Sequence, residues 1–441
     1  MIFKNSIFLF LYLSFSTYLH AQSTWFFKDS TNFDFIAEVS LNGNIIEGRT
    51  RKNALIDYLG ITKYDFVKKA YKIKYPEIIR FEGEKDKRSG VYHGSLDKLY
   101  SHYVLECILS GETLTLRLFD TTHKLLQQIK GHKLKEDYIS LNYKPVVEKI
   151  IKLTEENLFN PSLLSTKAWI NLKEKLQANE DSIRDDLELY TAVLALSLEL
   201  PFSHFSLLKQ HKETVHTNFS LKEINATTCI LKIPAFSGHK KSMENIITVI
   251  KKYKYKTLII DLRNNPGGDN ETSISLANFL IKKEFTSGFF PNKKWYTTFS
   301  RHPDKNDTAS FTIFTKGSLS EFYKKAQTGY GTTVKNKPAI TTFIGKIYVL
   351  INQGTASTAE AFTLALKENE IALIIGTRTS GQLLSAKKFR INNNLDIFIP
   401  LNNYISYLGY KVDKKGIEPD ITIKDSEIGD YILKHIVLNN D

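Results

Sequence analysis

The stretch from residue 346 to residue 382 constrains the fold of this chain more than any other. It begins with KIYVLIN, an apolar and β-rich run of the length that a buried strand needs. A turn of small residues, GTAST, comes next, and AEAFTLALKENE then carries apolar residues at helical spacing. ALIIG has the composition of a second buried strand. Strand, turn, helix and strand in this order predict an α/β unit with Ser357 at the start of its helix.

Ser357 stands where a nucleophile can act. The free backbone N–H groups and the dipole at a helix N-terminus favour a developing negative charge. The N–H of Thr358, the next residue, is placed to contribute to an oxyanion hole. An isolated serine at this position is better explained as a helix N-cap, so its assignment as a nucleophile depends on the rest of the chain.

A second turn upstream has the residues to complete such a site. LIIDLRNNPGG is a buried strand that ends in a pair of glycines, Gly267 and Gly268. Glycine allows a positive φ and lets a ligand approach the backbone closely. Either residue can therefore direct an N–H group at an oxyanion, although the same motif also fits a tight turn that only needs glycine.

The chain as a whole predicts three successive regions after its first residues. Residues 22–140 are β-rich, with hairpin signals at two turns and a last run, LLQQIKGHKL, that suggests an edge strand. Residues 141–210 carry three amphipathic helical patterns. Residues 211–441 alternate strand and helix, which indicates a largely parallel sheet with covering helices. Within residues 211–441, the segment 285–340 is polar and irregular in pattern, and we expect it to form a loop excursion over the active site.

The first 21 residues predict a secretory signal peptide, because Lys4 precedes a short apolar run that ends near Ala21. An anchor helix is less favoured, since the run is shorter than the ~20 residues that a span needs. The mature protein is therefore expected outside the cytoplasm, periplasmic or secreted. Its two cysteines, Cys107 and Cys229, are compatible with one disulfide or with two buried thiols.

The net charge of +13 does not by itself indicate a nucleic-acid partner. The lysines are scattered, with no basic cluster or known binding module, so a solvated surface is the favoured interpretation. Attraction to an anionic envelope surface stays open. No metal-ligand spacing, cofactor motif or further membrane-spanning stretch is evident, and the oligomeric state is not determined by the sequence.

Four blocks together resemble one family. LIIDLRNNPGG, YVLINQGTASTAEAF, IIGTRTSGQ and GIEPDITI occur in the order found in tail-specific, or C-terminal processing, serine peptidases. The resemblance covers roughly residues 141–425. It implies a crotonase-like (ClpP/crotonase) α/β core with a helical subdomain, with Ser357 as nucleophile and a peptide or protein as substrate. The space between FSHFSLL and TTCILKI is too short for the PDZ domain that many relatives carry.

One position departs from the processing branch of this family. That branch uses a Ser–Lys dyad with the lysine in a T-x-G-K turn, whereas this turn reads TSGQ and ends at Gln382. Glutamine cannot act as a general base. Lys387 and Lys388 follow several residues later, and either would reach the serine only if the loop were rebuilt.

The sequence is closer to the branch that resembles the tricorn protease core. That branch uses a Ser–His pair supported by a carboxylate and a second serine. The resemblance places Ser203 and His204 of PFSHFS in these roles, with Asp413 of VDKKGIEPD as a shorter substitute for the usual glutamate. His204 would act as general base, with a pKa near neutrality, and Ser357 would form an acyl-enzyme.

Two further acidic residues also match family positions. Glu360 is interpreted as support for the first turn of its helix, and Asp420 as structural. The alternative to a peptidase is a catalytically weak or inactive member of the family that binds a ligand or serves as an envelope interaction protein.

Overall fold

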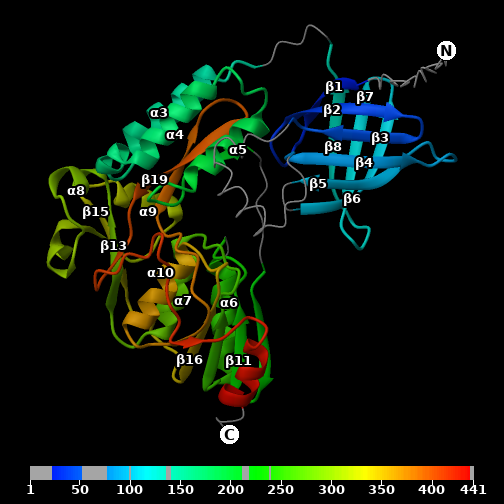
Figure 1. The fold of residues 1–441 in the computed structure, drawn as a ribbon. Coiled ribbons are helices and arrows are strands. Elements are labelled where there is room, and N and C mark those ends of the chain that lie inside the picture. The colour runs from blue at the N-terminus through cyan, green and yellow to red at the C-terminus, as the bar shows by residue number, and fades with distance from the viewer. Residues whose placement is uncertain are drawn as a thin grey trace, which may run out of the picture. The chain divides into compact units, whose positions relative to one another are not determined.

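The structure, a computed structural model, describes residues 22–51, 77–98, 101–135, 141–210, 218–237 and 240–437. The predicted signal peptide, and a helix suggested by the pattern of residues 52–75, lie outside these ranges. The chain forms two compact units (Figure 1). The first comprises residues up to Leu141 together with Arg184–Leu189, and the second comprises Asn142–Ile183 and Tyr190 onward.

The first unit is a closed antiparallel barrel of eight strands. They are β1 (Gln22–Lys28), β2 (Phe35–Asn42), β3 (Ile45–Arg49), β4 (Ile79–Lys85), β5 (Tyr92–Lys98), β6 (Ser101–Ser110), β7 (Thr113–Phe119) and β8 (Leu125–Lys133). Both predicted hairpins are present, as β2–β3 and β6–β7. The expectation of an edge strand at LLQQIKGHKL was wrong, because β8 pairs with β7 on one side and with β1 on the other.

Aromatic rings fill the interior of the barrel. Phe27 stacks on Phe35 with 4.8 Å between ring centroids and meets Phe81 edge-on at 6.1 Å. All three side chains are fully buried. A Cβ at Gly131 would lie 2.4 Å from the Phe27 ring, so this position has to be glycine for the ring to fit.

The second unit begins with helices. They are α3 (Lys144–Asn157), a 3-10 turn η1 (Pro161–Ser165), α4 (Lys167–Asn179) and α5 (Asp186–Ser197), whose first residues group with the barrel. Pro161 lies at the start of η1, where its missing N–H costs no helical hydrogen bond. Thr166 caps α4 by accepting a hydrogen bond from the Trp169 N–H at 3.4 Å.

A six-stranded sheet of order β10-β11-β12-β16-β17-β21 forms the centre of the second unit. Its strands are β10 (Ser220–Asn225), β11 (Thr228–Lys232), β12 (Thr257–Asp261), β16 (Lys346–Ile351), β17 (Leu373–Gly376) and β21 (Ile421–Thr422). Every pairing except β10–β11 is parallel, as the alternation of strand and helix predicts. The carboxyl ends of β12 and β16 therefore lie side by side, and the Gly-Gly turn and the Ser357 turn follow directly from them.

Helices cover both faces of this sheet. One face packs against α6 (Lys240–Tyr253), α7 (Asn270–Leu280) and α10 (Thr358–Glu368), and the other against α11 (Ile428–Tyr431) and the π-helical turn η3 (Ile432–Val437) (Figure 1). Ile260 belongs to the first core and Ile259 to the second, because successive side chains of a strand point to opposite faces.

Residues 285–340 are ordered, contrary to the expectation of an irregular excursion. They contain β13 (Phe285–Pro291), α8 (Lys293–Thr298), η2 (Lys305–Ser310), β14 (Thr312–Phe314), α9 (Leu319–Ala326) and β15 (Gly331–Asn336). With β20 (Ile405–Ser406) the strands form a sheet of order β14-β15-β13-β20. Phe290, Phe314 and Phe322 pack in one cluster with Leu364 of α10, which fixes this segment beside the Ser357 helix.

A third sheet has the order β18-β19-β9, formed by β18 (Ser385–Arg390), β19 (Leu395–Asn402) and β9 (Ser206–Lys209). It joins the segment after the TSGQ turn to the segment after His204. Cys107 and Cys229 are both buried free thiols, so they form no disulfide. Within the described ranges no helix is long and apolar enough to cross a membrane.

Candidate active site

Ser357 lies in a strained turn between β16 and α10. Its backbone has φ 53° and ψ −122°, a left-handed conformation that costs a residue with a side chain free energy. Such strain persists only where the surroundings enforce it, and a serine on a sharp strand-to-helix turn is the arrangement that exposes a nucleophilic hydroxyl. The Ser357 and Glu360 side chains are placed as a capping box at the start of α10, and the Ser357 hydroxyl also lines the cavity in front of the helix, so the serine is more than an N-cap.

Backbone hydrogen bonds from two sides hold this turn. The Ser357 N–H donates to the Gln382 carbonyl at 2.8 Å, and the Ala356 N–H donates to the Asn265 carbonyl at 2.9 Å. Gly267 packs directly against the turn, since a Cβ there would lie 2.7 Å from the Ser357 Cβ and 2.9 Å from the Thr358 nitrogen. The strained conformation is thus imposed by the Gly-Gly turn and the TSGQ turn together.

Of the two glycines predicted as oxyanion donors, only one has a free N–H. The Gly267 N–H donates to the Asn265 Oδ1 at 2.8 Å, which corrects its assignment as a donor. The N–H groups of Gly268 and Thr358 have no hydrogen-bond partner among the described residues. The Thr358 hydroxyl donates to the Gly268 carbonyl at 2.8 Å and so fixes the peptide beyond it. Gly268 and Thr358 therefore form the better pair of donors.

His204, Ser203 and Asp413 form a connected chain of hydrogen bonds. The Ser203 hydroxyl donates to the Asp413 Oδ1 at 2.5 Å, and its oxygen lies 2.7 Å from the His204 Nδ1. The Ser203 backbone N–H also donates to the Asp413 Oδ2 at 3.1 Å. His204 itself has a positive φ of 58°, so its backbone is strained as well. The shorter aspartate thus reaches the serine that the sequence pairs with it.

This chain sets the tautomer of the imidazole. A hydroxyl has one proton, and the Ser203 proton points to the Asp413 carboxylate. The contact between Ser203 and His204 can then be a hydrogen bond only if Nδ1–H is the donor. A neutral imidazole with its proton on Nδ1 has its lone pair on Nε2, the state in which histidine accepts a proton.

Burial keeps His204 in this neutral state. Loss of solvent around the half-buried ring lowers the pKa of His204 to about 4, below the near-neutral value expected from the sequence. Burial also raises the pKa of Asp413, although the hydrogen bonds from Ser203 oppose that rise. Ser357 and His204 line the same cavity, but within the described residues no hydrogen bond joins them. Catalytic hydrogen bonds in ligand-free sites are often long and shorten when substrate binds.

Glu360 does more than support the first turn of α10. Its fully buried carboxylate accepts hydrogen bonds from the Thr379 hydroxyl at 2.5 Å and from the Gly381 and Gln382 N–H groups at 2.8 and 2.9 Å. It also accepts from the Ser357 N–H at 3.1 Å. Burial raises the pKa of Glu360 and these donors lower it. Sequence spacing alone suggested a cap, because the contacts to 379–382 are long-range.

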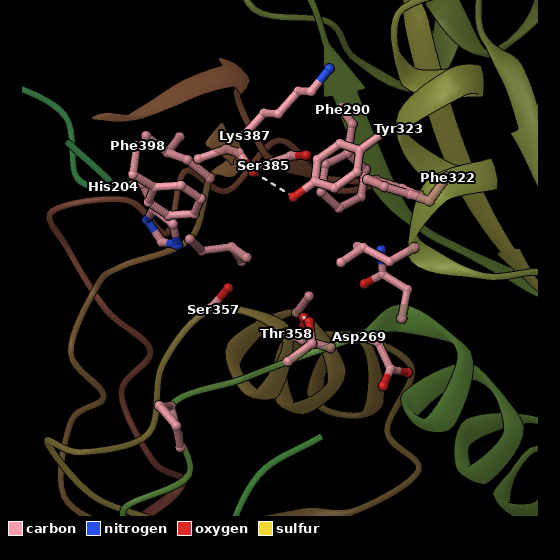
Figure 2. A pocket seen from close by; sticks show the side chains of 18 of the residues that line it. His204, Asp269, Phe290, Phe322, Tyr323, Ser357, Thr358, Ser385, Lys387 and Phe398 are labelled. Carbon is pink, nitrogen blue, oxygen red and sulfur yellow. Dashed lines mark hydrogen bonds between the residues drawn. The ribbon is translucent and has the colours of Figure 1, made fainter. Parts of the chain in front are cut away.

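The lysines that follow Gln382 do not replace the missing dyad lysine. The Lys387 side chain points away from Ser357 (Figure 2), and its ammonium lies 5.9 Å from the centroid of the Phe389 ring. Gln382 contributes its backbone, which joins Glu360 to the Ser357 turn. Asp420 is structural, as expected: it accepts the Ile374 N–H at 2.8 Å and pairs with Lys367 at 2.8 Å.

A cavity of about 670 Å³ opens in front of Ser357 (Figure 2). Its walls come from α7, β13, α9, α10 and β18, and they include Phe290, Phe322, Tyr323, Ala361 and Leu383. The segment 285–340 therefore does border the site, although as an ordered wall. Its aromatic residues occur in short pairs, Phe289–Phe290 and Phe322–Tyr323, without a sustained helical or strand periodicity, which is why no pattern there revealed them.

A comparison with protein families agrees with this geometry. Residues 227–423 match the family model described as Peptidase family S41. This part of the chain belongs to peptidase family S41. The matched S41 region contains Ser357, Gly268, Glu360 and Asp413, whereas His204 precedes it.

Curated relatives carry related names. The S41 region is similar to a carboxyl-terminal-processing peptidase 3, chloroplastic, of Arabidopsis thaliana, at 27% identity over 44% of this chain and 31% of that protein. It is also similar to a carboxyl-terminal-processing protease of Synechocystis, at 26% identity over 44% of this chain and 37% of that protein. The chain thus spans about a third of the length of these relatives. A lipoprotein structure from Streptococcus agalactiae matches with a TM-score of 0.46 and 17% identity, over 69% of this chain and 100% of that one.

In the described part of the chain no three histidine, cysteine, aspartate or glutamate side chains cluster as metal ligands would. The cavity in front of Ser357 offers hydroxyl, imidazole and backbone N–H groups instead. These groups suit acyl transfer.

Proposed function

We propose that this protein is a serine peptidase of the Ser–His type, with Ser357 as nucleophile and His204 as general base. The observation that carries the proposal is the strained Ser357 turn, whose side chain shares a cavity with an imidazole held in the Nδ1–H tautomer. The substrate is a peptide or protein. The α/β core is of the crotonase-like type, and no PDZ domain selects the substrate.

The reaction proceeds by acyl transfer. The His204 Nε2 takes the proton from Ser357 as its oxygen attacks the scissile carbonyl carbon. The negative charge that develops on the carbonyl oxygen is stabilised by the N–H groups of Gly268 and Thr358. His204 then passes its proton to the leaving amine, the C–N bond breaks, and an ester of Ser357 forms. Water, deprotonated by His204, hydrolyses this ester and regenerates the serine.

Ser203 and Asp413 have a supporting role. The charge that appears on His204 is stabilised through the Ser203 hydroxyl by the Asp413 carboxylate, as an acid supports the histidine of a triad. Because burial keeps the pKa of His204 low, this support matters at the moment when the imidazolium forms. Ser203 and Asp413 are therefore positioning residues that act through His204.

A fluorophosphonate probe tests the proposal directly. The purified protein is expected to be labelled covalently at Ser357, which peptide mass spectrometry locates. Ser357→Ala should abolish labelling, and His204→Ala should slow it by about a hundredfold or more. A folded wild-type protein that takes no label would contradict the peptidase function, and a His204→Ala variant that reacts like the wild type would exclude His204 as the base.

A further inference from the structure

The loop 337–345, which leads into β16, carries two isoleucines that stand clear of the protein. Ile340 is completely exposed, at 108% of the reference area, and Ile344 is 77% exposed. These are the two highest values among the large apolar side chains that the structure describes. Single apolar side chains on a surface are ordinary, but two that are this exposed on one short loop mark a site of interaction.

Backbone hydrogen bonds hold this loop against the end of α7. The Ala339 N–H donates to the Asn278 carbonyl at 2.8 Å, and the Phe343 N–H donates to the Phe279 carbonyl at 2.8 Å. The buried Phe343 ring meets the Phe279 ring edge-on, with 6.1 Å between centroids. The two isoleucines are therefore presented to solvent by a loop that is fixed at both of these points.

Lysines lie beside the loop, because several segments of the chain turn back at the same end of the sheet. The Lys346 N–H donates to the Lys256 carbonyl at 2.8 Å, where β16 and β12 begin side by side. The Lys251 ammonium, at the end of α6, lies 5.5 Å from the centroid of the Phe279 ring that supports the loop. All three lysines are exposed.

The segment after α7 adds more positive charge. Lys282 and Lys283 line a cavity whose wall also includes the end of the loop. Glu284 and Glu370 line this cavity as well, but Glu284 is already paired with Lys335 at 2.8 Å. Positive charge is therefore in excess around the two isoleucines.

These side chains form one surface at the opposite end of the sheet from the nucleophile. The 337–345 surface consists of Ile340 and Ile344 with the exposed lysines Lys251, Lys256, Lys282, Lys283, Lys337 and Lys346. The loop enters the amino end of β16, whereas Ser357 follows its carboxyl end, about 20 Å away at ~3.3 Å for each of the six strand residues. Figure 1 shows β16 at the lower end of the second unit, below α10. A partner bound at this surface thus leaves the cavity in front of Ser357 open.

The chemistry of the 337–345 surface matches the interface of an anionic lipid bilayer. Headgroup phosphates attract lysines that lie near the membrane plane, and exposed aliphatic side chains enter the acyl region beneath the headgroups. The centre of a protein–protein interface is instead depleted of charged residues, lysine among them. Two isoleucines that stand among lysines therefore fit a bilayer better than a protein partner.

We propose that the protein docks peripherally on an anionic lipid bilayer through the 337–345 surface, with Ile340 and Ile344 inserted below the headgroups and the lysines on the headgroup phosphates. This inference goes beyond the proposed peptidase function and does not depend on it. Docked in this way, the protein holds Ser357 at the end of β16 that is far from the bilayer.

Sedimentation with lipid vesicles tests the docking. The purified protein is mixed with vesicles of phosphatidylcholine alone, or of phosphatidylcholine with about 30 mol% phosphatidylglycerol, in about 0.1 M NaCl. We expect the partition coefficient to be at least about tenfold higher for the anionic vesicles, and to fall about tenfold in about 0.5 M NaCl, because salt screens the lysines. Equal partition into both kinds of vesicle, or none into either, would overturn the inference.

Substitution of the isoleucines tests the place of docking. Ile340→Ser/Ile344→Ser should lower partition into the anionic vesicles about tenfold or more, because both apolar contacts with the acyl region are lost. Ile170→Ser is the control, since Ile170 is also exposed, at 43%, but lies on α4 at the upper end of this unit in Figure 1. Partition of the isoleucine double variant equal to that of the control would exclude the 337–345 surface.

Reversal of the lysine charge tests the electrostatic part. Lys282→Glu/Lys283→Glu should lower partition into the anionic vesicles about tenfold or more. Lys167→Glu/Lys305→Glu makes the same change of net charge at two exposed positions of α4 and η2. Equal losses in the two double variants would mean that net charge alone attracts the protein, and that no particular surface docks.

A tryptophan in the loop reports insertion directly. The emission of Ile340→Trp should be quenched by lipids brominated on their acyl chains, whereas that of Ile170→Trp should not. The three native tryptophans, Trp25, Trp169 and Trp295, are buried, so the wild-type signal can be subtracted. Equal quenching of the two variants would show that the loop does not enter the bilayer.

The remaining outcomes separate this inference from others. A dimer in sedimentation velocity without lipid, lost in Ile340→Ser/Ile344→Ser, would identify a second copy as the occupant and overturn docking on a bilayer. All of these variants should be labelled at Ser357 by the fluorophosphonate at the wild-type rate, so a failure to bind vesicles leaves the peptidase function untouched. Should the isoleucine double variant not fold, the quenching of Ile340→Trp decides.

Discussion

Two buried carboxylates flank the Ser357 turn, and they do different work. Glu360 receives four hydrogen bonds, three of them from backbone N–H groups, so it determines the shape of the chain. Asp413 accepts a hydrogen bond from the Ser203 hydroxyl and so determines that the neutral His204 ring carries its proton on Nδ1. The position of the nucleophile and the direction of proton transfer are therefore controlled by different carboxylates. Substitutions that change only one of them can therefore test each role.

Removal of the nucleophile should have the largest effect on activity. Ser357→Ala is expected to reduce kcat for cleavage of denatured β-casein by about 10³-fold or more, because the acyl-enzyme cannot form. The free energy of unfolding should change little, since the backbone hydrogen bonds that hold the strained turn remain. Ser310→Ala, at an exposed serine of η2, is the control and should match the wild type. Equal cleavage by Ser357→Ala would remove the serine from the mechanism.

Disruption of the hydrogen-bond chain from Asp413 through Ser203 to His204 should have the next largest effect on activity. In Asp413→Asn the side-chain amide donates to the Ser203 oxygen, which turns the Ser203 hydroxyl toward the His204 Nδ1 and shifts the imidazole proton to Nε2. An imidazole in that tautomer cannot accept the serine proton, so kcat should fall about 10²–10⁴-fold with little change in KM. Asp420→Asn, at a carboxylate that binds Ile374 and Lys367, should leave kcat unchanged. Similar kcat values for the two variants would refute the role of this hydrogen-bond chain.

Glu360→Gln should give a smaller loss of activity together with a loss of stability. An amide nitrogen in place of one carboxylate oxygen confronts backbone donors with another donor, and an unsatisfied buried group costs about 1–3 kcal/mol. We expect a lower melting temperature and a kcat reduced about tenfold, since the Ser357 turn loosens. Glu244→Gln, at an exposed position of α6, provides the baseline for both measurements. A variant as stable as this baseline would show that Glu360 does not hold the turn.

The sequence predicted the side of the site that is built from consecutive residues. The strands before the Gly-Gly turn and before Ser357 are continuous apolar runs, and parallel pairing brings their carboxyl ends together, so the Gly-Gly turn and Thr358 could be placed near each other in advance. The sequence did not distinguish Gly268 from Gly267, whose N–H is bonded to Asn265. The contacts of Glu360 with residues 379–382 and the closure of the barrel by β8 join segments far apart in the chain. No local pattern encodes such contacts, which is also why the ordered wall formed by 285–340 was missed.

A change of pH near neutrality should alter activity less than any of these substitutions. At lower pH, the activity reports on the protonation of His204 itself. Because burial lowers its pKa to about 4, His204 stays neutral where an exposed histidine would already be protonated. The unfolded chain binds this proton at a higher pH than the folded one, so stability should fall as pH drops from about 6.5 toward 4. Circular dichroism at each pH separates this loss of structure from loss of activity.

The rate of fluorophosphonate labelling at Ser357, measured against pH on protein that circular dichroism shows to be folded, tests the central assignment most directly. A neutral His204 predicts a rate that is constant from about pH 8 down to about pH 5 and falls below that with an apparent pKa near 4. His204→Ala should lose this plateau. A wild-type rate that instead rises steadily and levels off only above about pH 9 would point to a lysine as the base and would contradict the Ser357–His204 mechanism.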